Sequence, residues 1–285
     1  MDYILLSVIV LGTVALLASV VLWTCSKRFA VDEDPRISKV VELLPGANCG
    51  GCGFAGCGGF AESLVKGADA GSLDGMVCPV SGSEVMSQIA KVLGVSASVA
   101  DPLIAVVCCD GSCEHRPRTD VSYDGLSTCA SMHSCGLCET GCGYGCLGCG
   151  DCCEVCQFGA ININSTTGLP EVDEEKCVAC GACVEACPRH IIELRRKGPK
   201  RRRVFVACRN KDKGAVAKRA CAVACIGCSK CVKECKFEAI TVIDNLSYID
   251  STKCRLCRRC VEVCPTHAIK EVGFEKRVCT SKTEE

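Results

Sequence analysis

Aromatic residues are scarce in this 285-residue chain, at 4% with a single tryptophan. Thirty-three basic residues balance thirty-three acidic ones, so no net charge points to nucleic acid as a partner. The four histidines form no pattern with carboxylates, no Walker-type loop occurs, and no G-x-G-x-x-G turn opens a strand–helix unit. These absences argue against acid–base catalysis, against nucleotide binding by this chain, and against a large aromatic core.

Cysteine is what the sequence has in excess, with 32 residues of this type. Such a density is typical either of a disulfide scaffold in a secreted protein or of metal binding in a reducing compartment. The compartment and the cysteine spacing must decide between the two.

A long apolar run opens the chain, from Tyr3 to Thr24, and is long enough to cross a bilayer as one helix. We therefore expect a transmembrane anchor over residues 1–26. Lys27 and Arg28 follow at once, and the positive-inside rule then puts the rest of the chain on the cytoplasmic side of a bacterial or archaeal plasma membrane.

Two alternatives to an anchor are a cleaved signal peptide and a lipoprotein site at Cys25. The first lacks a basic leading segment and has too long an apolar run, and the second lacks small residues before the cysteine. A reducing cytoplasm favours thiolate ligands over disulfides.

Residues 30–95 are expected to form a small domain around one 4Fe-4S cluster. Asp34 and Pro35 predict the start of a helix, and "SEVMSQIAKVL" predicts a second amphipathic helix that packs on it. Between them are four cysteines at cluster spacing with glycines around them: Cys49, Cys52, Cys57 and Cys78. Zinc is the alternative, but it usually takes paired, short-spaced cysteines.

Residues 146–197 carry C-x2-C-x2-C-x3-C twice, which is the signature of a two-cluster ferredoxin. In that signature the fourth cysteine of each run completes the cluster of the other run. The two predicted ligand sets are Cys146, Cys149, Cys152 with Cys187, and Cys177, Cys180, Cys183 with Cys156.

Residues 204–270 repeat the same pattern and predict a second two-cluster module. Its ligand sets are Cys225, Cys228, Cys231 with Cys264, and Cys254, Cys257, Cys260 with Cys235. Each of the four runs ends in an apolar step that predicts a short strand: Ala160-Ile161, Ile191-Ile192, Ala239-Ile240 and Ala268-Ile269. The expected fold class is α+β: one N-terminal transmembrane helix, a small 4Fe-4S domain and tandem ferredoxin-like modules, with residues 100–145 as a cysteine-rich connection and 271–285 as a tail.

The duplication extends beyond the ferredoxin motif. Cys225 follows Cys146 by 79 residues, and the same offset relates Cys221 to Cys142 and Cys208 to Cys129. The two cysteines ahead of each motif therefore belong to the repeating unit.

The chain resembles the B subunits of the Rnf complex, the ion-translocating ferredoxin:NAD+ oxidoreductase. The resemblance rests on the single anchor, on "DPRISKVVELLPGANCGGCGFAGC", on "YGCLGCGDC" and on the tandem ferredoxin motifs, and it covers nearly the whole chain. It implies a membrane-bound subunit of a translocase-type oxidoreductase, without a catalytic site of its own, that takes electrons from soluble ferredoxin. Other subunits of the complex would carry the NAD site and the ion path. It also implies ligation by Cys49, Cys52, Cys57 and Cys78.

Two features depart from that family. Many members have an apolar residue in place of Cys149 and use cysteines matching Cys142 and Cys146 with Cys152 and Cys156, so Cys142 and Cys149 compete as ligands of one cluster. The second departure is an excess of cysteines to which the family pattern gives no settled role: Cys108, Cys109, Cys113, Cys135 and Cys138. About five clusters are expected, and this region could either build one more or contain free or packed thiols. The sequence also assigns no role to Cys129, Cys208 and Cys221.

The basic run "RRKGPKRRR", Arg195 to Arg203, could attract an acidic partner such as ferredoxin, or could be a solvated loop between modules. Two other functions stay open. One is an electron-donor subunit of a related complex that keeps a redox-sensing regulator reduced, and the other is a membrane-tethered zinc or metal-storage protein.

Overall fold

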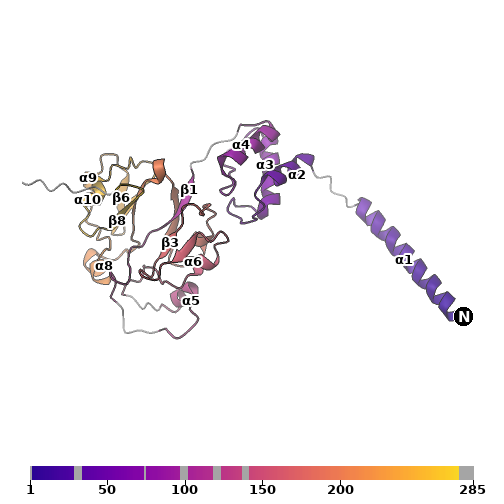
Figure 1. Ribbon diagram of the computed structural model, residues 1–285, viewed down its shortest axis with the longest axis horizontal. Helices are drawn as coiled ribbons and strands as arrows, with labels where there is room; N and C mark the ends of the chain where they lie inside the picture. Colours follow the sequence, from indigo (N-terminus) through magenta and orange to yellow (C-terminus); the bar gives the residue numbers. More distant parts are fainter. Residues whose placement is uncertain are drawn as a thin grey trace, which may run out of the picture.

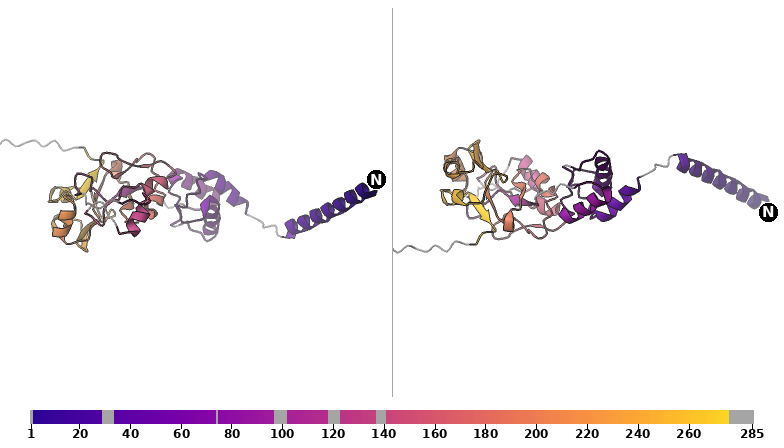
Figure 2. Two further views of the ribbon diagram at one scale, coloured as in Figure 1. Left: turned by 90° about the horizontal axis from the view of Figure 1, so that it is seen from below. Right: turned by 90° about the horizontal axis from the view of Figure 1, so that it is seen from above.

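The elements of this chain lie in a row. The computed structural model describes residues 2–28, 34–73, 75–96, 102–117, 123–136 and 141–275. Figure 1 and both views of Figure 2 show the same order from one end to the other: the long helix α1, a small helical domain, and then two mixed modules. Mixed helices and strands in this arrangement confirm the predicted α+β class.

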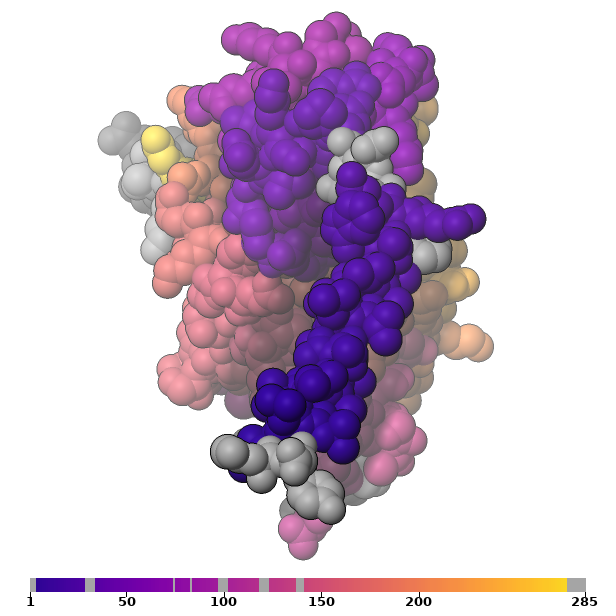
Figure 3. Space-filling model, turned by 90° about the vertical axis from the view of Figure 1, so that its right-hand side faces the viewer, coloured from indigo at the N-terminus to yellow at the C-terminus, as the bar shows by residue number. Residues whose placement is uncertain are grey.

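The helix α1 (Asp2–Arg28) projects from the rest of the molecule, toward the viewer in Figure 3. It is long and apolar enough to cross a membrane, and none of its most apolar stretch is buried inside the structure. Lys27 Nζ lies 5.3 Å from the ring centroid of Trp23, just where the apolar run ends. An apolar helix without protein around it is what a membrane anchor requires.

Three helices form the N-terminal domain: α2 (Pro35–Leu43), α3 (Gly56–Asp69) and α4 (Gly82–Leu93). The predicted cap of α2 is confirmed, since the Asp34 side chain accepts from the backbone N–H of Arg36 at 2.8 Å. The core brings together Val40, Phe60, Leu64 and Ile89, all at most 1% exposed, so α4 packs on α2 as expected.

Two antiparallel strand pairs build the first ferredoxin module. β1 (Leu103–Val107) pairs with β4 (Ile192–Arg196), and β2 (Ile161–Ile163) pairs with β3 (Pro170–Val172). Three short helices complete it: α5 (Cys129–Ser134), α6 (Asp151–Glu154) and α7 (Ala182–Glu185). β1 comes from the segment expected to be a connection, so the module begins before Cys146.

The second module repeats this plan. β5 (Arg203–Val206) pairs with β8 (Ile269–Val272), and β6 (Ile240–Ile243) pairs with β7 (Leu246–Ile249). Its helices are α8 (Gly214–Ala220), α9 (Lys230–Glu234) and α10 (Arg259–Glu262), and a short 3-10 turn (Pro199–Arg201) joins the modules. The strands predicted after each cysteine run are confirmed as β2, β4, β6 and β8.

The registers of the two modules correspond. Val107 lies opposite Ile192 in the first module, and Val206 lies opposite Ile269 in the second. β1 and β5 are therefore equivalent strands, and the cysteines that follow them, Cys109 and Cys208, are equivalent in space. The 79-residue offset had paired Cys208 with Cys129 instead, because the segment between β1 and the first motif is longer than its counterpart.

The two modules are joined through a buried seam. Ile104 and Val106 of β1 pack with Phe205 of β5, and the Asp110 N–H donates to the Ala207 carbonyl at 3.1 Å. Glu193 on β4 accepts from the guanidiniums of Arg195 and Arg209. Burial alone would raise the pKa of Glu193, but the two arginines outweigh it and hold the pKa below its ordinary value. The carboxylate is thus a charged partner shared between the modules.

The N-terminal domain touches the first module at Gly51. A Cβ added to Gly51 would lie 2.7 Å from the carbonyl oxygen of Cys180 and 2.8 Å from its Cα, so only glycine permits this approach. The close contact brings the loop with Cys49 and Cys52 next to the loop with Cys180.

Candidate metal centres

Four cavities lie in the two modules, two in each. Each is lined by four cysteines from both halves of its module. Cavities with such similar linings fit four copies of one group.

Three of the four cavities contain the cysteines expected from the motifs. These sets are Cys156, Cys177, Cys180 and Cys183 in the first module, and Cys225, Cys228, Cys231 with Cys264, and Cys235, Cys254, Cys257 with Cys260, in the second. The exchange of the fourth cysteine between the two runs is visible in all three.

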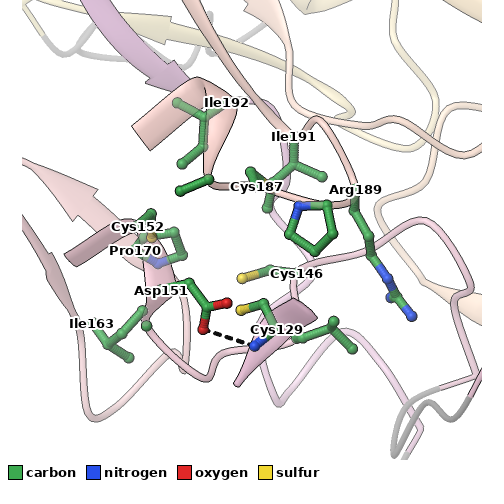
Figure 4. Close-up of a pocket in the computed structure, with 14 residues that line it drawn as sticks. Cys129, Cys146, Asp151, Cys152, Ile163, Pro170, Cys187, Arg189, Ile191 and Ile192 are labelled. Carbon is green, nitrogen blue, oxygen red and sulfur yellow. Dashed lines mark hydrogen bonds between the residues drawn. The ribbon is translucent and has the colours of Figure 1, made fainter. Parts of the chain in front are cut away.

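The remaining cavity, drawn in Figure 4, differs from the expectation. Cys146, Cys152 and Cys187 line it as predicted, but the fourth cysteine is Cys129. The start of α5 holds Cys129 there, because its N–H donates to Asp151 Oδ1 at 2.7 Å. The Cys149 thiol lies outside the lining and donates to Met132 Sδ at 3.1 Å. The sequence assigned no role to Cys129. Two features could have indicated it: Thr128, which caps the helix that begins at Cys129, and the recurrence of a cysteine ahead of each ferredoxin motif.

Cys142 also lies outside that cavity. Its Sγ accepts from the Asn210 side-chain amide at 3.6 Å, which comes from the second module. Cys142 and Cys149 were the two alternative ligands that the sequence offered for this cluster, and neither lines the cavity.

A left-handed turn follows the second cysteine of every motif. The residues there are Gly150, Gly181, Ser229 and Arg258, with φ values of 94°, 87°, 58° and 68°. Left-handed backbone costs a non-glycine residue about 1–2 kcal/mol, yet the second module uses serine and arginine. The second module keeps the turn despite that cost, which indicates that the cysteine positions, rather than local propensity, decide the backbone here.

Backbone N–H groups point at several cysteine sulfurs. The N–H of Ala160 lies 3.3 Å from Cys156 Sγ, and the N–H of Ser247 lies 3.5 Å from Cys225 Sγ. Hydrogen bonds to ligating sulfur stabilise the more negative state of a cluster and so tune its potential. These contacts are what a thiolate ligand needs and what a packing thiol does not.

Burial disfavours the ionised form of these thiols in the absence of a metal. It raises the pKa of Cys183 to about 11 and that of Cys260 to about 12, with neighbouring cysteines adding to the effect. Such groups become thiolates only when a cation replaces the proton. The donor chemistry therefore fits a metal group in each cavity.

The spread of the cysteines around each cavity favours clusters over single ions. Zinc holds its four ligands about 2.0–2.3 Å from one point. In the described ranges, no three or more histidine, cysteine, aspartate or glutamate side chains come together closely enough for a single metal ion. A four-iron cluster is larger, and its thiolates stand around a volume instead of a point.

The N-terminal domain places three of its four motif cysteines against its core. Cys78 is buried, and Cys52 and Cys57 pack against the same apolar cluster. The N–H of Cys57 donates to Asn48 Oδ1 at 2.8 Å, and Gly56 leaves room for that side chain. Cys49 lies on the side facing the first module, where it acts electrostatically on Cys180.

Other cysteines have different surroundings. Cys108 is 1% exposed in the seam between modules, and burial raises its pKa to about 12. Cys153 is half-buried against the core of the first module, and Cys113 and Cys135 are exposed. Cys138 lies outside the described residues. The histidines are four in number and line none of the four cavities.

Family models match three parts of the chain. Residues 44–71 match "Putative Fe-S cluster", residues 145–191 match "4Fe-4S dicluster domain", and residues 247–270 match "4Fe-4S binding domain". With the cavities above, these matches define an iron–sulfur protein of the multi-cluster ferredoxin class.

Relatives over most of the length identify the family. The chain is 44% identical to the B subunit of the Na(+)-translocating ferredoxin:NAD(+) oxidoreductase complex of Acetobacterium woodii, over 94% of this chain and 78% of that protein. It is 42% identical to the B subunit of the ion-translocating oxidoreductase complex of Methanosarcina acetivorans, over 93% and 97%. The B subunit of the proton-translocating ferredoxin:NAD(+) oxidoreductase complex of Clostridium ljungdahlii is 37% identical, over 95% and 94%. The chain belongs to the B subunits of ion-translocating oxidoreductase complexes of the Rnf type.

Proposed function

We propose that this chain takes electrons from reduced soluble ferredoxin and relays them toward the membrane subunits of an ion-translocating complex that reduces NAD+. One observation carries the proposal: the N-terminal domain and the two modules, which contain the cysteine groups, follow α1 one after another in a row (Figure 1). Bound 4Fe-4S clusters would supply one-electron carriers, and the chain's own part is to hold them, space them and set their surroundings.

Five groups of cysteines would hold these clusters. We assign Cys49, Cys52, Cys57 and Cys78 to the first, and the four cavities of the modules to the others. In the cavity of Figure 4 the fourth ligand is Cys129, in place of Cys149 or Cys142, because Cys129 lines it with Cys146, Cys152 and Cys187.

The close contact between Gly51 and Cys180 supports a path by which electrons leave the modules. It joins the N-terminal cysteine group to the cavity of Cys177, Cys180 and Cys183. That cavity and the one in Figure 4 share a module, and the second module lies beyond them. Electrons that enter at the far module would therefore leave through the domain nearest the anchor.

A basic cleft supports an entry point at the far module. It has a volume of about 890 Å³ and is lined by Arg195, Arg196, Arg202 and Arg203 together with Cys254. Cys254 also lines one of the four cavities, so the cleft lies against the wall of a cluster site. A positively charged surface there would attract an acidic ferredoxin and raise its encounter rate at low salt.

Not every arginine of the run serves this cleft. Arg201 pairs with Glu175 and does not line the cleft, and Arg203 donates to Glu174 at 2.6 Å. Exposed Arg196 and half-buried Arg202 both line it and are the residues to change.

The docking test compares Arg196→Gln/Arg202→Gln with Arg201→Gln in the full chain. We expect the double variant to be reduced by ferredoxin about tenfold more slowly at low ionic strength and with a shallower salt dependence. Arg201→Gln should behave like the wild type. Equal rates and salt slopes in all three would remove the cleft as the docking site and leave the relay untouched.

Anchoring of α1 with the modules on the cytoplasmic side completes the proposal, since Lys27 and Arg28 directly follow the apolar run. Protease accessibility in right-side-out and inverted vesicles tests this sidedness. Digestion of the modules only in inverted vesicles is expected.

The alternative function is electron donation in a related complex that reduces a redox-sensing regulator. It would use the same electron transfer through 4Fe-4S clusters in this chain. The full-length relatives are named for ferredoxin and NAD(+), which favours the first function. Co-purification of the neighbouring subunits, followed by an assay for ferredoxin-dependent NAD+ reduction, separates the two.

A further inference from the structure

Four cysteines outside the four cavities meet between the two ferredoxin modules. The first module contributes Cys109 and Cys142, and the second contributes Cys208 and Cys221. Cys142 and Cys221 are 5% and 6% exposed, and the other two are partly buried. None of them is used by the sites described above.

The four are arranged as two equivalent pairs. Cys109 and Cys208 each stand two residues beyond equivalent strands, β1 and β5. Cys142 and Cys221 each stand four residues before the first cysteine of a ferredoxin motif. The set therefore consists of equivalent positions from the two modules.

The hydrogen bonds to sulfur repeat in the same way. Cys109 Sγ accepts from the Cys146 N–H at 3.5 Å and interacts with the Gly111 N–H. Cys208 Sγ accepts from the Asn210 N–H at 3.4 Å and interacts with the Cys225 N–H. In each module the donors are the residue two positions on and the first cysteine of the motif. Paired N–H donors are the surroundings expected of ligating sulfur.

Three contacts draw the pairs together. The Asp110 N–H bonds the Ala207 carbonyl at 3.1 Å, which sets Cys109 beside Cys208. Asn210, 1% exposed, donates through its backbone to Cys208 Sγ and through its side chain to Cys142 Sγ at 3.6 Å. A Cβ on Gly141 would lie 3.9 Å from the Ala220 Cα, so Cys142 and Cys221 adjoin.

Electrostatics agree with this proximity. Burial raises the pKa of Cys221, and Cys109 and Cys142 raise it further, while Arg116 lowers it. Arg116 is 6% exposed and donates from Nη1 to the Cys146 carbonyl at 2.7 Å. A buried guanidinium offsets the negative charge that four thiolates around iron would bring.

We propose that Cys109, Cys142, Cys208 and Cys221 hold a further 4Fe-4S cluster between the modules. The proposal rests on the proposed function in taking iron and sulfide as the cofactor of the other sites. Its consequence is that neither module alone can bind this cluster, so the two modules form one electron-transfer unit.

Neighbouring cysteines provide matched controls. Cys108 is next to Cys109, but its equivalent in the second module is Ala207, so Cys108→Ala copies the repeat. Val232 stands 79 residues after Cys153, so Cys153→Val does the same. Neither residue belongs to a group of four, and both substitutions should leave all cluster sites intact.

The experiment uses the full chain, purified anaerobically and reconstituted with ferrous iron, sulfide and a thiol reductant. Cys109→Ser/Cys208→Ser and Cys142→Ser/Cys221→Ser are compared with the wild type and the two controls. Iron, acid-labile sulfide and zinc are counted, and electron paramagnetic resonance spectra of the reduced proteins are recorded.

The proposal predicts that each double variant loses about four iron and four sulfide per chain and one component of the reduced spectrum. Both controls should match the wild type. Circular dichroism checks that each variant folds. If one double variant misfolds, the other still tests the proposal.

Other outcomes overturn the proposal. Iron and spectra that stay unchanged in both variants would make these four cysteines packing residues, with the other clusters retained. Loss of about one zinc, with iron unchanged, would make the site a zinc site. A wild-type chain that takes up no iron would instead refute the proposed function itself.

Discussion

The two ferredoxin modules share a framework and differ in one ligand loop. In the second module, every motif cysteine lines the cavity expected for it. In the first, α5 inserts Cys129 into one cavity, and Cys149 turns to Met132. The segment between β1 and the first motif is longer in the first module, and α5 belongs to it. The comparison teaches that a duplicated metal site can keep its cavity while an insertion changes which residue completes it.

The largest expected effect separates Cys129 from Cys149. Cys129→Ser should lower bound iron by about four per chain, because its thiol lines the cavity, whereas Cys149→Ser should keep the wild-type iron content. Cys228→Ser, at the position equivalent to Cys149, should lose about four iron, because Cys228 lines its cavity. Iron loss from Cys149→Ser with retention in Cys129→Ser would reverse the assignment.

The next largest effect is a loss of stability when an ion pair at the seam between the modules is broken. Glu193→Gln removes the carboxylate that serves two largely buried arginines, and we expect the free energy of unfolding to fall by about 3 kcal/mol. The equivalent residue of β8 is Lys270, whose partner Asp110 is 2.5 Å away and whose side chain is 40% exposed. Lys270→Met should cost less, about 1 kcal/mol, because the lysine itself is partly exposed, although its partner atom Asp110 Oδ2 is buried. Chemical denaturation of the reconstituted chain measures both, and equal losses would contradict the difference in burial.

A smaller effect concerns the N-terminal domain. Gly51→Ala puts a methyl group against the Cys180 backbone, so we expect the domain to separate from the first module without loss of iron. Gly58→Ala is the control, because a Cβ there has nothing within 4 Å. Small-angle scattering should detect a larger radius of gyration for Gly51→Ala alone. The radius of gyration and the electron transfer from the modules to the N-terminal cysteine group could both stay unchanged. That result would show that the contact at Gly51 is not needed to hold the domain against the first module.

The smallest effect is predicted for Cys153→Val, which gives the first module the residue of the second. Because the position is half-buried and the second module accommodates a valine at the equivalent place, stability should change by less than about 1.5 kcal/mol. Iron content and reduced spectra should match the wild type. A loss of iron would make Cys153 a ligand after all.

Much of this arrangement could be predicted from the sequence because iron–sulfur motifs are local in the chain. The spacing of cysteines gave three of the four module cavities, and the apolar steps after them gave four strands. Asp34 and Pro35 marked the start of α2 correctly.

What escaped prediction depends on contacts between distant segments. The position of Cys129 in its cavity requires α5 to fold back onto Asp151, and a spacing pattern contains no such information. The pairing of Cys109 with Cys208 follows from strand register, whereas the sequence offset pointed to Cys129, because an insertion had shifted the numbering. Positive φ at Ser229 and Arg258 runs against local preference, so propensity could not indicate those turns.

The most direct test of the account is the metal content of the full chain purified without oxygen. Five groups of cysteines predict about twenty iron and twenty acid-labile sulfide per chain, and the group between the modules raises each to about twenty-four. Broad visible absorption that bleaches on reduction by ferredoxin should accompany them. A colourless protein with a few zinc ions and no sulfide would contradict the central claim that this chain is a row of 4Fe-4S clusters.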